Sequence, residues 1–278
     1  MNFAPISVLI STYKNDSPLY LEEALLSLKN QTLLADEIIL VIDGYVDESL
    51  IKIIENFKYD GKFKYYKLEK NYGLAYCMNY ALKKATNDIV ARMDADDICF
   101  KNKFEMQYNI LKQIKNKNTV ITSLSLDFID SIDNIQSLKE TPKDNEEIKK
   151  ILKYRNIVCH PTIMLYKSIF EKYGNYNQNV GLLEDYELHL RLIHNGVQYY
   201  CIQEPLIYIR STEYQVRRRG GFKYYINECK FRYKCYKNNY ISLSDFLITI
   251  FIYSFFRLAP VKIKKVLYKL VRKNIKEH

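Results

Sequence analysis

Three aspartates lie within four residues of one another, directly after a short apolar run. Asp94, Asp96 and Asp97 follow residues 89–93, which read as a buried strand. Adjacent carboxylates repel one another unless a cation or hydrogen-bond donors neutralise them. Mg²⁺ and Mn²⁺ prefer oxygen ligands and commonly bridge carboxylates to substrate phosphates. The group therefore predicts a divalent metal that holds a diphosphate. An acidic turn that merely caps the helix beginning near Asn102 is the alternative.

The elements that must position this turn alternate between strand-like and helical patterns over the first hundred residues. Such alternation is typical of parallel strands joined by crossover helices. Ser17 and Pro18 predict the start of the first helix, as N-cap and first helical residue. Open parallel sheets bind ligands beyond the carboxyl ends of their strands, so the polar residues that follow each strand should meet there. We predict four strands, at residues 6–11, 38–42, 63–68 and 89–93.

Polar residues do follow these predicted strands. The first strand runs into Ser11 and Tyr13, the second into Asp43, and the fourth into the acidic turn. Beyond about residue 115 the alternation weakens, and we expect mixed α/β structure without an internal repeat or linker. The further predictions are strands at 120–128, 162–166, 199–202 and 206–209, and helices at 145–153 and 184–195.

Composition narrows the class of protein. The 278 residues carry a formal net charge of +10, and much of the excess lies in the last quarter of the chain. Its six cysteines show no C-x-x-C pair or metal-ligand spacing, which favours free thiols in a reducing cytoplasm. The first residues lead straight into a strand-like run without a basic segment, so no signal peptide is expected.

The C-terminal segment combines apolar and basic residues. Residues 246–256 are apolar almost all round, yet a helix of this length is well short of the ~30 Å hydrocarbon core. After Pro260 apolar residues occupy one predicted helical face, and lysines and arginines cover the rest. We expect residues 243–273 to bind a membrane surface. A core helix followed by an amphipathic helix packed on the main domain is an equally supported alternative.

Several motifs together carry a family resemblance. No G-x-G-x-x-G or G-x-x-x-x-G-K-[ST] occurs, which argues against dinucleotide enzymes and P-loop NTPases. The chain instead resembles the family 2 inverting glycosyltransferases of the GT-A fold, over roughly residues 5–210. The motifs that carry the resemblance are residues 6–13 (ISVLISTY), 41–44 (VIDG), 71–75 (NYGLA), 93–97 (MDADD), 160–162 (HPT), and 184–188 (EDYEL) with Arg191.

The resemblance implies a role for each matching position. Asp185 would be the catalytic base, although a carboxylate there could simply cap the following helix. Asp94 and Asp96 would be the ligands of Mn²⁺ or Mg²⁺, with Asp94 also near the ribose. The family's usual acid before Asp43 is replaced by Ile42 in this chain. The donor-binding residues would be Ser11, Tyr13, Asp43, Asn71, Gly73, Asp94, Glu184 and Arg191.

The expected fold is α/β of the GT-A type: a Rossmann-like, mostly parallel sheet with helices on both faces, followed by a C-terminal helical membrane-proximal segment. Residues 1–115 would bind the nucleotide sugar, 116–212 the acceptor, and 213–278 would form the basic segment. We expect transfer of a hexose or N-acetylhexosamine from a nucleotide diphosphate donor, here UDP, to a lipid-linked saccharide in surface-polysaccharide synthesis, at the inner face of the cell membrane. No nucleic-acid partner is expected. The alternatives are a non-catalytic nucleotide-sugar-binding protein and a soluble enzyme with a protein or small-molecule acceptor.

Overall fold

The computed structural model describes residues 2–211 and 222–258, and the chain divides into two compact units. The first unit comprises residues 1–179 and 184–210, and the second comprises residues 180–183 and 211–278. The halves predicted at 1–115 and 116–212 thus share the first unit, apart from residues 180–183 and 211–212. The predicted basic segment 213–278 belongs to the second unit.

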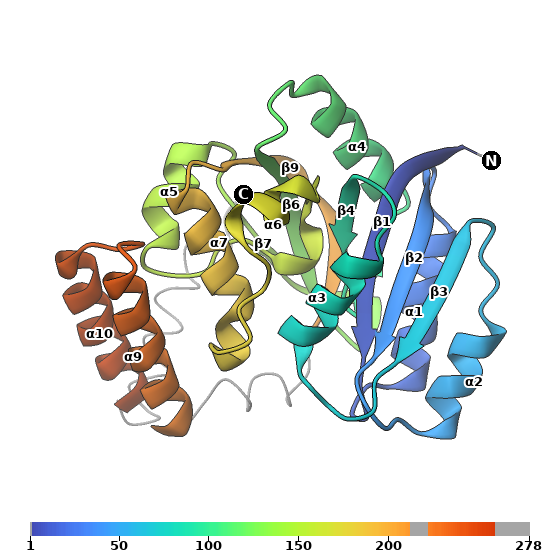
Figure 1. Cartoon of the computed structure of the whole chain (residues 1–278), viewed down its shortest axis with the longest axis horizontal. Helices are drawn as coiled ribbons and strands as arrows, with labels where there is room; N and C mark the ends of the chain where they lie inside the picture. The colour runs from blue at the N-terminus through green and yellow to red at the C-terminus, as the bar shows by residue number, and fades with distance from the viewer. Residues whose placement is uncertain (1, 212–221, 259–278) are drawn as a thin grey trace. The chain divides into compact units, whose positions relative to one another are not determined.

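The first unit is built on one mixed sheet with helices packed against it (Figure 1). Its strands are β1 (Phe3–Thr12), β2 (Leu34–Ile42), β3 (Lys62–Lys67), β4 (Ile89–Arg92), β5 (Ile98–Cys99), β6 (Thr119–Ile129), β7 (Ser131–Lys139), β8 (Met164–Tyr166) and β9 (Gln198–Arg210). Its helices are α1 (Pro18–Lys29), α2 (Glu48–Asn56), α3 (Leu74–Lys84), α4 (Lys103–Gln113), α5 (Asn145–Leu152), η1 (His160–Thr162), α6 (Ser168–Tyr173) and α7 (Glu184–His194).

The sheet is parallel in its N-terminal part and mixed beyond it. Its order is β3-β2-β1-β4-β8-β6-β9-β5, with β7 paired to β6. The strands β3, β2, β1 and β4 are all parallel neighbours, as the alternating sequence pattern predicts. β8 runs antiparallel to β4 and β6, while β9 runs parallel to β6 and antiparallel to β5. β1, from the start of the unit, pairs with β4, and β9, from its end, pairs with β5. Strands from the two ends of the unit therefore flank the turn that joins β4 to β5.

The two faces of the parallel strands are covered by different helices. Ile6, Val8 and Ile10 of β1 are fully buried with Leu21 and Leu25 of α1 in one apolar cluster. Because successive strand residues face opposite sides, the remaining β1 positions turn to the other face, where α3 packs on β1 and β2. The helices on both faces hold the strands in place and so determine where their carboxyl ends lie.

Some elements differ from the sequence predictions. The strand predicted at 162–166 is split into η1 and β8, and the strands predicted at 199–202 and 206–209 are one continuous strand, β9. Its pairing with β6 shifts register near Pro205, which explains how the strand continues through a residue without an N–H group. β5 and β7 have no counterpart among the predicted strands.

In the second unit α9 (Phe222–Lys237) and α10 (Leu243–Leu258) pack against each other. Ser242 and Asp245 form a reciprocal cap at the start of α10: the Asp245 N–H donates to Ser242 Oγ, and the Ser242 N–H donates to Asp245 Oδ2. Within the described residues, no helix has both the length and the apolar character needed to cross a membrane. The predicted amphipathic helix after Pro260 lies outside the described residues.

Candidate functional site

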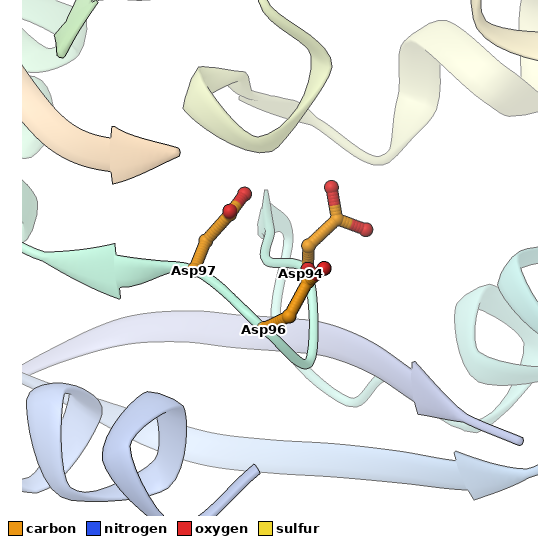
Figure 2. Close-up of side chains that lie close together, drawn as sticks. All are labelled: Asp94, Asp96 and Asp97. Atoms are coloured by element: carbon orange, nitrogen blue, oxygen red, sulfur yellow. The ribbon is translucent and has the colours of Figure 1, made fainter. Parts of the chain in front are cut away.

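The three aspartates of the predicted metal site lie on the turn between β4 and β5 (Figure 2). One carboxylate oxygen from each of Asp94, Asp96 and Asp97 lies within 4.8 Å of the others. β4 is buried throughout, so the turn begins on a rigid element at the carboxyl end of a central strand. Asp97 is 1% exposed, whereas Asp94 and Asp96 are half-buried.

The charges on this turn are only partly balanced by the protein. Burial raises the pKa of Asp96 to about 6, and the neighbouring Asp94 carboxylate adds to this shift. Burial also raises the pKa of Asp97 well above its usual value, again with help from Asp96 and Asp94. The buried Arg92 forms an ion pair with Asp94 and opposes both shifts. The site thus favours a further positive charge when all three groups are ionised.

A divalent cation fits this set of groups. Oδ1 of Asp97 accepts the Arg210 backbone N–H at 3.0 Å, but its Oδ2 is buried without a hydrogen-bond partner among the described residues. A buried carboxylate oxygen without a donor is costly, and a metal ion would satisfy it. The carboxylate set is the hard oxygen chemistry that Mg²⁺ and Mn²⁺ select. Asp97 therefore joins Asp94 and Asp96 as a residue able to hold the ion.

A fourth carboxylate near this turn was not predicted. Asp16 follows β1 and accepts hydrogen bonds from the Tyr13 N–H and the Thr12 hydroxyl, both at 3.0 Å. Burial raises its pKa to about 7, and the charges of Asp96 and Asp94 contribute to the rise. Its position just beyond a strand end was the available signal, because that is where the other site residues were sought. The predicted residues Ser11 and Tyr13 lie on the same strand end.

Asp43, predicted as a donor-binding residue, performs a structural task. Its two carboxylate oxygens accept the backbone N–H groups of Tyr72 and Gly73, at 2.7 and 2.9 Å. These donors lie at the N-terminus of α3, where Gly73 is the N-cap. The side chain of Asn71 donates to the Asp43 carbonyl oxygen at 3.4 Å. Asp43, Asn71 and Gly73 are therefore brought together, and Asp43 binds the loop before α3 to the end of β2.

Gly44 allows this close approach. Its φ is +85°, and a Cβ atom there would lie 2.6 Å from the Asn71 backbone nitrogen. Both facts demand glycine, because other residues adopt this φ at a cost and no side chain fits against that backbone. The turn after β2 is thus built so that the two loops beside the parallel strand ends lie in direct contact.

The predicted base, Asp185, lies in the first turn of α7. Its Oδ1 accepts its neighbour Tyr186 N–H at 2.7 Å, and its Oδ2 accepts the Asn156 side-chain amide at 3.0 Å. These two donors fix the orientation of the carboxylate at the helix N-terminus. Its neighbour Glu184 is buried. Asn156 was not predicted; it lies in the loop after α5, and no local pattern marks it.

Tyr176 connects the two acidic regions electrostatically. This buried tyrosine has a raised pKa, caused first by burial; Asp185, Glu184 and Asp94 add to the shift. Its hydroxyl lies 3.0 Å from His160 Nε2, and His160 Nδ1 lies 3.2 Å from His189 Nε2. Burial lowers the pKa of both histidines, so they are neutral at physiological pH. Carboxylates at the start of α7 and on the acidic turn thus both raise the pKa of Tyr176.

Arg191, predicted as a donor-binding residue, makes its hydrogen bonds within the protein. Its Nε and Nη2 donate to the two carboxylate oxygens of Glu187 at 2.9 and 3.0 Å. The remaining N–H groups donate to the carbonyl oxygens of Tyr173, Gly174 and Asn175. All five donors of the guanidinium are therefore engaged. In this geometry Arg191 supports the loop before Tyr176, and its predicted contact with the donor stays a prediction.

Comparisons with known proteins show the family of this chain. The sequence model of glycosyl transferase family 2 matches residues 7–174. A UDP-Gal:alpha-D-GlcNAc-diphosphoundecaprenol beta-1,3-galactosyltransferase of Escherichia coli is 36% identical over 95% of this chain and 95% of its own length. The amylovoran biosynthesis glycosyltransferase AmsE of Erwinia amylovora is 32% identical over 96% of this chain and 99% of its own.

Solved structures show the same fold. The crystal structure of Staphylococcus aureus TarS 1-349 in complex with UDP-GlcNAc superposes with a TM-score of 0.66, covering 92% of this chain and 73% of that one, at 18% identity. The mixed α/β sheet is thus of the GT-A type, as the motifs predicted. On its family match and its full-length relatives, the chain belongs to glycosyl transferase family 2 and is a glycosyltransferase.

Proposed function

We propose that this enzyme is a metal-dependent, inverting transferase that moves a hexose or N-acetylhexosamine from a UDP-linked donor to a lipid-linked saccharide. The acceptor would be an intermediate of capsule- or O-antigen-type polysaccharide synthesis. The observation that carries the proposal is the acidic turn, whose three carboxylates converge within 4.8 Å and include a buried oxygen to which no group in the described part of the chain donates. Such a site needs a cation, and a diphosphate is the ligand that shares one.

The donor end would be held by the acidic turn. Asp94, Asp96 and Asp97 would bind Mn²⁺ or Mg²⁺, which when bound stabilises negative charge on the leaving diphosphate. Ser11 and Tyr13, at the end of β1, would line the nucleoside pocket. Asp43 would contact the nucleobase only through lone pairs that the Tyr72 and Gly73 N–H groups leave available.

The acceptor end would use Asp185. An inverting transfer needs a carboxylate that accepts the proton of the acceptor hydroxyl as its oxygen attacks the anomeric carbon. The Asn156 amide and the Tyr186 N–H donate to Asp185 and would orient its carboxylate for this role. The lipid-diphosphate acceptor named for the Escherichia coli relative, which aligns over 95% of both chains, supports the same acceptor class here.

An activity screen tests the proposal. Wild-type protein with Mn²⁺ and a synthetic lipid-diphosphate N-acetylglucosamine is offered UDP-glucose, UDP-galactose and UDP-N-acetylglucosamine, and UDP release and the product anomer are measured. We expect acceptor-dependent UDP release with one donor and a β-linked product from an α-linked donor. Asp185→Asn should lose at least 100-fold in kcat and still bind UDP with Mn²⁺. A product that retains the donor's anomeric configuration, or normal turnover by the variant, contradicts the proposal.

The second unit supports a position at the inner face of the membrane. Apolar side chains of α10 are exposed, with Phe251 at 75%, and lysines 230, 234 and 237 on α9 are exposed as well. Basic residues attract the unit to anionic lipid headgroups, and exposed apolar side chains gain by entering the interface. We propose that α10, with the basic residues of its unit, lies on the bilayer surface.

Vesicle flotation tests this part separately. Full-length protein is mixed with vesicles containing anionic lipid, and Phe251→Glu is compared with Leu19→Glu, which places the same charge at an exposed apolar position of α1. We expect Phe251→Glu to reduce the floating fraction and Leu19→Glu to leave it unchanged. Failure of the wild-type protein to float, or equal loss in both variants, overturns the membrane proposal without touching the transferase chemistry.

A further inference from the structure

Arg210, the last residue of β9, is a buried cation beside the acidic turn. It is 1% exposed, and its guanidinium carbon lies 3.8 Å from the ring centre of Tyr20 and 4.5 Å from that of Phe128. The two aromatic rings fix the position of the guanidinium and contribute a favourable cation–π interaction. A charged group is held here only if its hydrogen bonds are made inside the protein.

Those hydrogen bonds reach the acidic turn twice. The Arg210 backbone N–H donates to Asp97 Oδ1, and its side-chain Nε donates to the Asp96 carbonyl oxygen, both at 3.0 Å. The other guanidinium nitrogens bind the Asp130 carbonyl oxygen at 3.2 Å and the carboxylate of Glu23 on α1. One side chain therefore connects α1, the β6–β7 turn and the acidic turn.

The backbone before Arg210 is also held next to the acidic turn. β9 pairs with β5, which directly follows the acidic turn, through Ile98 with Tyr208 and Cys99 with Ile207. Tyr208 also stacks on Phe100, with ring centres 4.3 Å apart. The ladder fixes the C-terminal side of the turn, and the Arg210 side chain fixes its centre. The positive charge of Arg210 also favours the ionised form of Asp96.

We infer that Arg210 is a positioning residue that prepares the acidic turn for a divalent metal ion. Its planar fork holds the Asp96 backbone, and its backbone N–H anchors Asp97, so that the carboxylates converge before the ion arrives. Lysine keeps the charge but cannot bind the Asp96 carbonyl, the Asp130 carbonyl and Glu23 at once. The inference rests on the metal site of the proposed function, and it makes no claim that Arg210 touches the substrate.

Direct measurement of Mn²⁺ binding tests this role without relying on activity. The signal of free Mn²⁺ in electron paramagnetic resonance is titrated with full-length wild-type protein, Arg210→Lys and Leu111→Ala, each with saturating UDP. Leu111 is fully buried on α4, so its truncation lowers stability by a cavity without touching the turn. Loss of a residue that orients ligands typically weakens metal binding by about 10–100-fold. We expect such a loss in Arg210→Lys and wild-type affinity in Leu111→Ala.

The outcomes separate three cases. Wild-type affinity in Arg210→Lys, or an equal loss in both variants, overturns the inference and leaves Arg210 as a structural residue. Failure of the wild-type protein to bind Mn²⁺ contradicts the proposed metal site itself. If Arg210→Lys does not fold, Glu23→Gln removes the carboxylate that holds the guanidinium from the more exposed side. That variant should weaken Mn²⁺ binding in the same direction, and unchanged affinity would count against the inference.

Discussion

Asp16 should lower the stability of the metal-free enzyme at neutral pH, and its replacement by Asn should reverse this. Its pKa is raised from 3.8 to about 7 in the folded protein, first by burial and then by the charges of Asp96 and Asp94. The folded state therefore binds the Asp16 proton more tightly than the unfolded chain does. Between about pH 4 and pH 7 the unfolded chain loses that proton first, so the free energy of unfolding falls as the pH rises.

The size of the effect follows from the shift. About three pKa units correspond to roughly 4 kcal/mol at pH 8, and about 1.5 kcal/mol of this is already present at pH 5. Asn keeps one acceptor oxygen for the Tyr13 N–H or the Thr12 hydroxyl, and loss of the other bond costs about 1 kcal/mol. Asp16→Asn should therefore stabilise the protein by about 3 kcal/mol at pH 8 and by about 0.5 kcal/mol at pH 5.

Urea unfolding at pH 5 and pH 8, with EDTA present, measures both values. Glu55→Gln, at an exposed position of α2, controls for the general effect of removing one negative charge. A gain in stability that is equal at the two pH values would refute the reasoning. So would destabilisation at pH 8, because it would mean that the hydrogen bonds to the Asp16 carboxylate outweigh burial and repulsion.

Three further variants test individual roles. Asn156→Ala should lower kcat by about tenfold with little change in donor KM, because the amide orients Asp185; steady-state kinetics at varied donor concentration measure both constants. Asp43→Ala should lower the free energy of unfolding by about 1–3 kcal/mol, measured by urea unfolding, since two backbone N–H groups at α3 lose their acceptor. Arg191→Lys should lower the melting temperature, measured by calorimetry, because it loses contacts with Glu187 and three carbonyls inside the protein. Donor KM should stay unchanged, and a raised KM would indicate that Arg191 contacts the donor.

Most of the parallel half of the fold was predictable because three of its strands, β1, β2 and β4, contain continuous apolar runs. The cores of β1, β2 and β4 are buried on both faces, and such strands stand out against the amphipathic helices between them. β7 is exposed along most of its length, so it has no alternation of apolar and polar residues to detect. β5 has only two residues, and its existence depends on pairing with β9, which is distant in the sequence.

The candidate site was predictable only where its residues form a local motif. Asp94, Asp96 and Asp97 are neighbours in sequence, and their meeting requires nothing but a turn. Arg210 reaches the same turn from a position 113 residues beyond Asp97, and only the β5–β9 ladder brings it there. The internal partners of Arg191 could not be predicted, because a motif states a residue's position but not which groups accept its hydrogen bonds.

The place of β9 has a consequence for how the chain acquires its active form during synthesis. The matched family region ends at residue 174, whereas β9 is inserted between β6 and β5 and carries Arg210 to the acidic turn. A nascent chain emerges from its N-terminus, so α1, α3 and the parallel strands can collapse while β6 still lacks its parallel partner. Closing so long a loop is a late and slow step. The acidic turn should therefore reach its final geometry only after translation has passed residue 210.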